Sequence, residues 1–131
     1  MANRVVHFEI EAKDADRANK FYTAAFGWDI EQMGKEYGGY LVVKTGDPKE
    51  PTGINGGIYQ TQDKKELNAY SCVIAVEDVL KSMGDVKNAG GKVLSEKPTD
   101  IPDVGLFAKC EDTEGNRFSL LQPSPQMQPK N

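Results

Sequence analysis

The sequence repeats one order of elements twice, and this repeat limits the fold more than any other feature. In the first half a segment of alternating apolar and polar residues leads to Asp14, a helical pattern and Gly27. In the second half Asp78 and Gly90 stand 12 residues apart, against 13 for the first pair. Asp is a favoured helix N-cap, and Gly favours the left-handed position after the last turn. We therefore expect two small modules that pair, because neither can bury a core alone.

Hydrophobic periodicity predicts the elements of the first module. It favours a helix over Ala15–Phe26 and strands over 5–12, from 28, 37–44 and 56–59. The helix carries an apolar stripe at helical spacing, which we expect to pack on a sheet: Ala18, Phe21, Tyr22, Ala25 and Phe26. We expect residues 45–57 to form a plain surface connection. The alternative is a mobile loop that covers a pocket.

The second module follows the same scheme. Asp78 caps a predicted helix with Val79, Met83 and Val86 on one face. Strands are predicted over 70–76, 92–94, 106–111 and 117–122, with a loop over 95–104 and a linker over 60–68. A tight turn over 112–116 joins the last two strands, and Gly115 and Asn116 tolerate the positive φ that such a turn needs.

Composition narrows the class of protein. Apolar residues make up 38% and charged residues 27% of the 131 residues, as in a soluble globular domain. The net charge of −4 disfavours nucleic acid as a partner, because phosphate binding needs a basic face. No apolar run is long enough to cross a bilayer, so we expect no membrane partner. No export signal is visible, so we expect a cytoplasmic protein whose Cys72 and Cys110 are reduced and packed in strands.

Several short motifs give this order of elements a family resemblance. They are Phe21-Tyr22 and Phe26-Gly27-Trp28 around the first helix, Ala89-Gly90-Gly91-Lys92-Val93 after the second, and Asp112-Thr113-Glu114-Gly115-Asn116 near the end. Over residues 4–122 the chain resembles the vicinal oxygen chelate superfamily of glyoxalase I, bleomycin-resistance proteins and extradiol dioxygenases. It is most similar to small bacterial glyoxalase-like proteins.

The resemblance implies an α+β fold of two paired βαβββ modules, which form a curved mixed sheet around a cavity. Residues 1–122 would form this single glyoxalase-like domain, from modules 4–60 and 69–122, and residues 123–131 a flexible tail. Relatives commonly dimerise, and edge strands are available, so we expect a homodimer.

Metal-dependent members take ligands from four strands, and the resemblance transfers these positions to this chain. The first falls on His7 and the third on Ser71, each seven residues before a helix cap. The fourth falls on Ser119, seven residues after Asp112, and the second within Gly57-Ile58-Tyr59, which holds no carboxylate. His7 is then the only retained ligand, and a stable divalent site needs three or more His, Cys or carboxylate groups. We expect no cofactor, with a rearranged metal site that uses Glu9 or Glu11 as the alternative.

His7 and Glu9 are the candidate catalytic residues, because a strand carries alternate side chains on one face. His7 is a metal ligand, a general acid or base, or an imidazole hydrogen-bonded in a polar cavity. Glu9 is a base with a shifted pKa, an anchor for a cationic ligand, or a half-exposed strand carboxylate.

Aromatic and small polar residues complete the candidate site. Tyr40, Tyr59 and Phe107 fall on strands predicted to line the hollow, where they would bind a small organic ligand or serve as core. Ser71 and Ser119 would line the same ligand site. Trp28 is expected at a module edge or dimer contact.

Two other kinds of site are not supported. The carboxylates around Asp112 are spaced for a turn rather than for calcium. The segment 53–57 lacks a phosphate-binding fingerprint, so a nucleotide role has no support.

Two classes of function follow. The first is a module that binds a small organic molecule without the usual metal. The second is a lyase, isomerase or dioxygenase that uses a metal, or His7 and Glu9 as an acid/base pair. A purely structural subunit is a third class, because fold does not fix function.

Overall fold

The computed structural model describes residues 3–34, 37–47, 49–50, 53–61 and 70–125. Contacts within the chain divide it into two compact units. The first module is His7–Tyr70, and the second module is the chain from Ser71 together with the segment before His7. Within the described residues each module holds one helix and several strands, so the predicted α+β class is confirmed. Of the predicted linker over 60–68, Gln60 is the last residue of a strand and residues 62–68 lie outside the described residues. Of the predicted tail over 123–131, Pro123 is the last residue of a strand and residues 126–131 lie outside the described residues.

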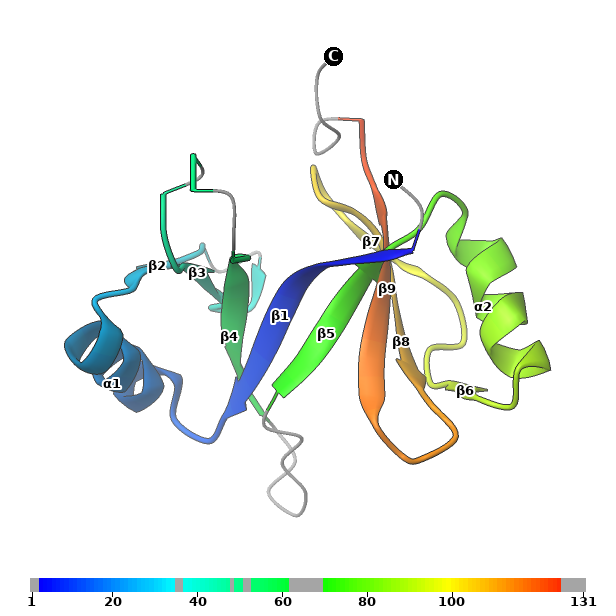
Figure 1. The fold of residues 1–131 in the computed structure, drawn as a ribbon, viewed down its shortest axis with the longest axis horizontal. Coiled ribbons are helices and arrows are strands. Elements are labelled where there is room, and N and C mark those ends of the chain that lie inside the picture. Colours follow the sequence, from blue (N-terminus) through cyan, green and yellow to red (C-terminus); the bar gives the residue numbers. More distant parts are fainter. Residues whose placement is uncertain (1–2, 35–36, 48, 51–52, 62–69, 126–131) are drawn as a thin grey trace. The chain divides into compact units, whose positions relative to one another are not determined.

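The first module is a four-stranded sheet with a helix on one face (Figure 1). Its elements are β1 (Arg4–Ala12), α1 (Ala15–Phe26), β2 (Asp29–Gln32), β3 (Leu41–Lys44) and β4 (Gly56–Gln60). The strands lie in the order β2-β3-β4-β1. Strand β3 is antiparallel to both β2 and β4, whereas β1 and β4 are parallel. The first and last strands of the module are therefore direct neighbours.

The second module repeats this arrangement. Its elements are β5 (Tyr70–Ala75), α2 (Val79–Asn88), β6 (Lys92–Val93), β7 (Thr99–Ile101), β8 (Gly105–Glu111) and β9 (Arg117–Pro123). The strands lie in the order β5-β9-β8-β6, and β7 pairs with β8 as well. Its first and last strands, β5 and β9, are again parallel neighbours. The predicted internal repeat is thus present in strand pairing as well as in sequence.

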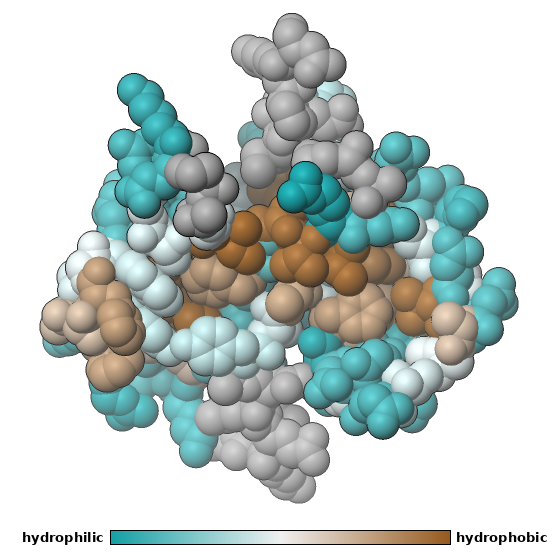
Figure 2. Space-filling model, in the orientation of Figure 1, coloured by the Kyte–Doolittle hydropathy of each residue, from teal (hydrophilic) through white to brown (hydrophobic). Residues whose placement is uncertain are grey.

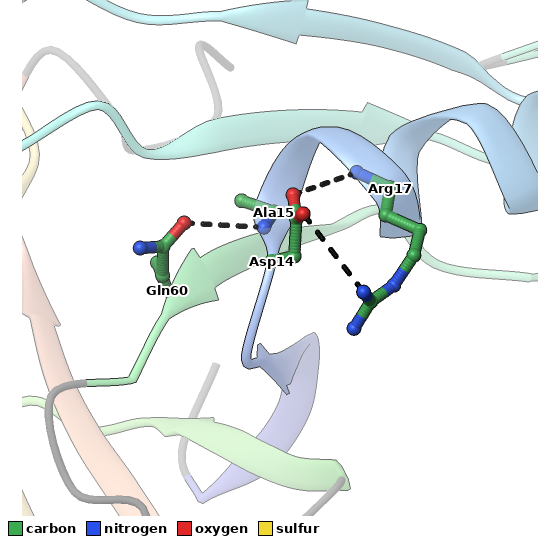
Figure 3. A network of polar contacts seen from close by, with 4 residues as sticks. All are labelled: Asp14, Ala15, Arg17 and Gln60. Atoms are coloured by element: carbon green, nitrogen blue, oxygen red, sulfur yellow. Dashed lines mark hydrogen bonds and ion pairs between the residues drawn. The ribbon is translucent and has the colours of Figure 1, made fainter.

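Both helices begin with the same two hydrogen bonds. In α1 the Asp14 carboxylate accepts from the Arg17 backbone N–H at 3.1 Å (Figure 3). The Gln60 side-chain oxygen, at the end of β4, accepts from the Ala15 N–H at 3.3 Å. These bonds satisfy backbone donors that have no partner within the helix.

The same pair of bonds recurs in α2. Asp78 accepts from the Lys81 N–H at 3.1 Å, and Gln122, at the end of β9, accepts from the Val79 N–H at 3.0 Å. The Asp caps were predicted, but the two glutamines were not.

Each helix buries one face of its own sheet. In the first module the core side chains are Ile10, Ala12, Ala15, Leu41, Val43 and Ile58. In the second module they are Val76, Val79, Met83, Ala108, Cys110 and Leu120. Cys110 and Cys72 are both free thiols, as expected, but only Cys110 is buried. The expectation that Cys72 is packed as well was wrong, because this side chain is exposed on its strand. Among the described residues no helix is long and apolar enough to cross a membrane.

The Phe26-Gly27-Trp28 motif turns the chain so that an aromatic cluster closes over α1. Gly27 has φ of +71°, a conformation that suits glycine, and it follows the last helical residue. Beyond this turn the Trp28 ring stacks on Tyr22, with centroids 4.9 Å apart and planes 3° from parallel. Trp28 therefore packs at the junction of helix and sheet. It directly precedes β2, the edge strand of the sheet, which agrees with the expected module edge, and the alternative of a dimer contact stays a prediction.

The predicted apolar stripe of α1 is only partly buried. Ala15 is buried, and Ala18 and Tyr22 pack against the core. Phe21 and Phe26 are 58% and 64% exposed, and Figure 2 shows apolar side chains at the surface over α1. Including these two rings in the packed stripe was wrong. The Phe21 ring lies edge-on to the Phe26 and Tyr22 rings, and both phenylalanines stay largely exposed.

Two predicted loop and strand boundaries differ from the structure. The strand expected from residue 37 begins at Leu41, because Gly38 and Gly39 have φ of +67° and +76° and form a turn. The segment 95–104, expected as a loop, contains the short strand β7. That strand pairs with β8 from Thr99 to Ile101, although its sequence has too few residues to show a strand pattern.

The carboxylate of Asp112 stabilises the turn between β8 and β9. One carboxylate oxygen accepts from the backbone N–H groups of Glu114 and Asn116, at 2.8 and 2.9 Å. Gly115 has φ of +85°, whereas Asn116 does not need the positive φ that was expected of it. The acidic residues here thus serve the turn, as predicted. Hydrogen bonds from Asn116 hold the pKa of the Asp112 carboxyl below its ordinary value.

We expect Gln60→Ala and Gln122→Ala to lower the free energy of unfolding by similar amounts, about 0.5–1.5 kcal/mol each. Each change removes the acceptor for the first N–H of one helix. Urea unfolding followed by circular dichroism measures the loss. Gln32→Ala, at an exposed position on β2, is the matched control and should have little effect. An equal loss in the control would contradict the role given to the two glutamines.

Candidate functional site

The candidate site lies on the face of the first-module sheet that points away from α1. Along β1 the apolar side chains Phe8, Ile10 and Ala12 belong to the α1 core. His7, Glu9 and Glu11 alternate with them and therefore face the opposite side. All three are partly buried. The structure thus places the two candidate catalytic residues, His7 and Glu9, on one face, as the alternation predicted.

Tyr40, just before β3, brings His7 and Glu9 together. Its hydroxyl lies 2.9 Å from Nε2 of His7. The same hydroxyl donates to Oε2 of Glu9 at 3.3 Å. The phenol thus bridges an imidazole and a carboxylate that stand two residues apart on β1. Sequence placed Tyr40 at this site only as an aromatic wall.

Gly57 on β4 makes this bridge sterically feasible. It pairs with Glu9 on one side and with Val42 on the other, between β1 and β3. A Cβ atom at position 57 would lie 1.7 Å from the Tyr40 hydroxyl oxygen and 1.9 Å from the ring carbon that bears it. Any side chain at 57 would occupy the volume of the phenol. The absence of a side chain here lets Tyr40 cross β4 and reach β1.

The neighbouring Gly56 does the same on the other face of the sheet. A Cβ atom there would lie 2.5 Å from the Phe8 ring, which packs against the α1 core. The Gly56-Gly57 pair therefore admits one aromatic ring on each face of β4. Sequence reasoning assigned these glycines only to a strand beginning after an irregular segment. Two adjacent glycines inside a strand pattern are the signal that could have suggested close approach of a ring.

A second phenol–carboxylate pair extends the polar face. The hydroxyl of Tyr59 on β4 donates to Oε1 of Glu11 at 2.7 Å. Glu11 and Tyr59 are register partners on the parallel strands β1 and β4. Tyr59 also contributes to the electrostatic environment of Tyr40. The polar face therefore contains one imidazole, two carboxylates and two phenols, all within the first module.

Burial sets the protonation of this face. It lowers the pKa of the His7 imidazole below its ordinary value of 6.5, so His7 is neutral at pH 7. Burial also raises the pKa of the Tyr40 phenol, and the negative charge of Glu9 and the hydrogen bond to it raise that pKa further. Tyr40 therefore remains a protonated donor at neutral pH. A neutral imidazole beside a protonated phenol suits hydrogen-bond recognition and proton transfer alike.

The other predicted ligand-binding residues lie in the second module. Ser119 on β9 pairs with Val73 on β5, so Ser119 and Ser71 share one face of that sheet. Phe107 pairs with Leu121, two residues beyond Ser119, and belongs to the same face. Ser119 is buried, with 4% of its surface exposed, and Ser71 and Phe107 are partly buried. This set shares a face, and the α2 core occupies the opposite face. That the set binds a ligand stays a prediction.

The residues at the transferred metal positions do not fit a divalent ion. His7 supplies one good donor, whose Nε2 contacts the Tyr40 hydroxyl. At position 57, one of the three residues on which the second ligand position falls, the phenol fills the space of a side chain. Ser71 and Ser119 offer hydroxyls, which are weak donors for such ions. In the part of the chain that the structure describes, no three His, Cys, Asp or Glu side chains gather as a metal site would require.

Comparisons with known proteins show which family this chain is similar to. Residues 4–46 match the family model described as bleomycin resistance protein-like N-terminal. A Mycobacterium tuberculosis protein named as a glyoxylase, CFP32, is 34% identical over 119 residues, which are 90% of this chain and 43% of that protein. A glyoxylase-like domain-containing protein of Didymella fabae is 30% identical over 114 residues, 86% of this chain and 88% of that protein. The chain thus spans less than half of the first relative and most of the second.

A solved structure shows the same fold. Methylmalonyl-CoA epimerase of Streptomyces coelicolor superposes with a TM-score of 0.71 at 16% identity, over 98% of this chain and 100% of the epimerase chain. At this identity the likeness concerns the fold alone. It confirms the predicted glyoxalase-like fold class.

We expect stability to fall at acid pH because of His7. Its folded-state pKa is lowered, so below about pH 6.5 the unfolded chain binds the proton first. The free energy of unfolding should therefore be highest above pH 6.5 and fall as the pH drops toward the folded pKa. Urea unfolding at pH 7.5, 6.5 and 5.5 measures this change. His7→Gln, which cannot titrate, should lose less stability over the same range, and an identical loss would refute the assignment.

We expect Gly57→Ala to destabilise the protein by about 1–3 kcal/mol, because the new methyl group overlaps the Tyr40 ring. Gly84→Ala in α2 is the matched control, since a Cβ there meets nothing within 4 Å. The control should be neutral or stabilising by up to about 1 kcal/mol, because Ala favours helix. Thermal unfolding of both variants measures the difference. Equal stability of the two variants would show that the phenol does not lie over Gly57.

Proposed function

Because the chain belongs to the vicinal oxygen chelate superfamily, the group of glyoxalases and bleomycin-resistance proteins, we propose that it binds a small organic molecule without the usual metal. The molecule would lie on the polar face of the first module, the face that carries His7, Glu9, Glu11, Tyr40 and Tyr59. One observation carries this proposal: both phenols donate to carboxylates on the same sheet face, beside a neutral imidazole.

The polar face has the chemistry of a binding site for an organic ligand. Aromatic walls give contact area, and a few fixed polar groups give orientation. The Tyr40 and Tyr59 rings would supply the contact area. The carboxylates of Glu9 and Glu11, together with His7, would orient the ligand. The phenols already hold the carboxylates in place, so less conformational entropy is lost when a ligand binds.

The second-module residues would contribute to ligand binding in the same way. Ser71, Phe107 and Ser119 share a sheet face that combines two hydroxyls with one aromatic ring. We keep them as proposed ligand-binding residues. A homodimer in the cytoplasm is the proposed state of the protein, and sedimentation velocity would test the dimer.

The second candidate function is an enzyme of lyase, isomerase or dioxygenase type. The relatives named as glyoxylases support it, and so does the hydrogen-bonded connection from His7 through Tyr40 to Glu9. In this function His7 and Glu9 would act as an acid/base pair. Turnover of a candidate substrate such as methylmalonyl-CoA would support it only if His7→Ala and Glu9→Gln each abolish the activity. Unchanged turnover in both variants would exclude these residues from catalysis.

We expect a fragment library of small organic molecules to yield stabilising ligands for protein kept in EDTA. A ligand at 100 times its Kd stabilises the folded state by about 2.7 kcal/mol, which raises Tm by several degrees. Differential scanning fluorimetry measures the shift. Glu9→Gln should weaken the response, whereas Glu96→Gln, the same charge change at an exposed loop position, should leave it unchanged. Ligands that act only after a divalent ion is added would overturn the metal-free proposal.

A further inference from the structure

Tyr40 occupies two places that a metal ion on this face would need. The first is the space over position 57, one of the three residues on which the second ligand position of the metal-dependent relatives falls. A Cβ atom there would lie 1.7 Å from the Tyr40 hydroxyl oxygen. The second is the ring nitrogen Nε2 of His7, which lies 2.9 Å from the same hydroxyl. One oxygen atom therefore blocks both the best donor and the neighbouring ligand position.

We propose that the Tyr40 phenol takes the place of the metal ion on this face, holding His7 with its proton on Nε2 and keeping divalent ions out. Gly57 is the residue that permits this substitution. Tyr40 is thus a positioning residue, which acts through His7 and Glu9.

The direction of the hydrogen bonds follows from the number of protons available. The phenol has one hydrogen, which it donates to the Glu9 carboxylate. A charged acceptor makes the stronger bond, even at the longer distance of 3.3 Å. The phenol oxygen then accepts from His7, whose proton must be on Nε2. The chain of donors runs from His7 Nε2–H to the Tyr40 O–H and ends at Glu9 Oε2.

This arrangement defines what the imidazole offers to a ligand. With the proton on Nε2, a neutral imidazole has Nδ1 as its acceptor. The protonated Nε2 cannot bind a metal ion on the side of Tyr40, and Nδ1 is the ring nitrogen left to accept a hydrogen bond from a ligand. The ligand class is then one that presents a hydroxyl or N–H donor to His7. This step rests on the proposed function, whereas the replacement of the metal by Tyr40 does not.

The single histidine of the chain makes the tautomer directly measurable. Protein with ¹⁵N-labelled histidine gives one imidazole pattern in a long-range ¹H–¹⁵N correlation spectrum at pH 7.5. We expect the Nε2–H tautomer in the wild type and a mixture of both tautomers in Tyr40→Phe. Tyr59→Phe is the matched control, since Tyr59 donates to Glu11, and should keep the wild-type pattern. An Nδ1–H wild type, or an unchanged pattern in Tyr40→Phe, would overturn the proposal.

A metal titration tests the exclusion of divalent ions with the metal alone. Untagged wild-type protein titrated with Ni²⁺ in a calorimeter should show no stoichiometric binding. The double variant Tyr40→Ala with Gly57→Glu removes the phenol and adds a carboxylate beside His7 and Glu9. We expect it to bind Ni²⁺ at least 100-fold more tightly, and His7→Ala in that background should remove the gain. Tight binding by the wild type, or equal weak binding by both proteins, would overturn the proposal.

Neither test needs an organic ligand or an activity. A failed fragment screen with the expected tautomer and metal behaviour would overturn the proposed binding function and leave the role of Tyr40 intact. Ligands found in EDTA, together with an Nδ1–H tautomer, would support the proposed binding function and overturn the role of Tyr40.

Discussion

The parallel pairing of the first and last strands is the constraint on which each module depends. A glutamine at the end of the last strand accepts from the first N–H of the helix, which follows the first strand. This side-chain bond joins the strand pair to the helix N-terminus, and the adjacent Asp cap fixes the start of the first turn. The helix is thereby held against one face of the sheet. The proposed ligand-binding side chains lie on the opposite face. Both modules use this solution, although their sequences correspond only weakly.

In the first module two adjacent glycines let a different aromatic ring pack on each face of β4. Gly56 receives the Phe8 ring on the apolar side, and Gly57 receives the Tyr40 ring on the polar side. A strand with side chains at both positions would hold the two rings off the sheet. Tyr40 could then not reach His7 and Glu9 on β1. The polar face therefore depends as much on what β4 lacks as on the side chains that β1 supplies.

Local patterns predicted the elements, whereas contacts across strands did not follow from them. Asp14 and Gly27 predicted the bounds of α1, because capping is decided within a few residues. The alternation along β1 predicted that His7 and Glu9 share a face, because the period of a strand is local as well. The bridge through Tyr40 depends on register between β1, β3 and β4, and no short segment contains that information. Strand β7 was missed for a similar reason, since three residues on β8 define it.

The overlap of the Tyr40 ring with the space above Gly57 also affects how mutations at these two positions combine. Substitutions at positions 40 and 57 are not independent, because a side chain at 57 overlaps the ring at 40 and costs less stability after that ring has been lost. The order of mutation is therefore constrained, and the intermediate with neither group has the emptiest face. The effect of a side chain at 57 thus depends on a residue that directly precedes another strand of the sheet, which is epistasis set by register rather than by sequence distance.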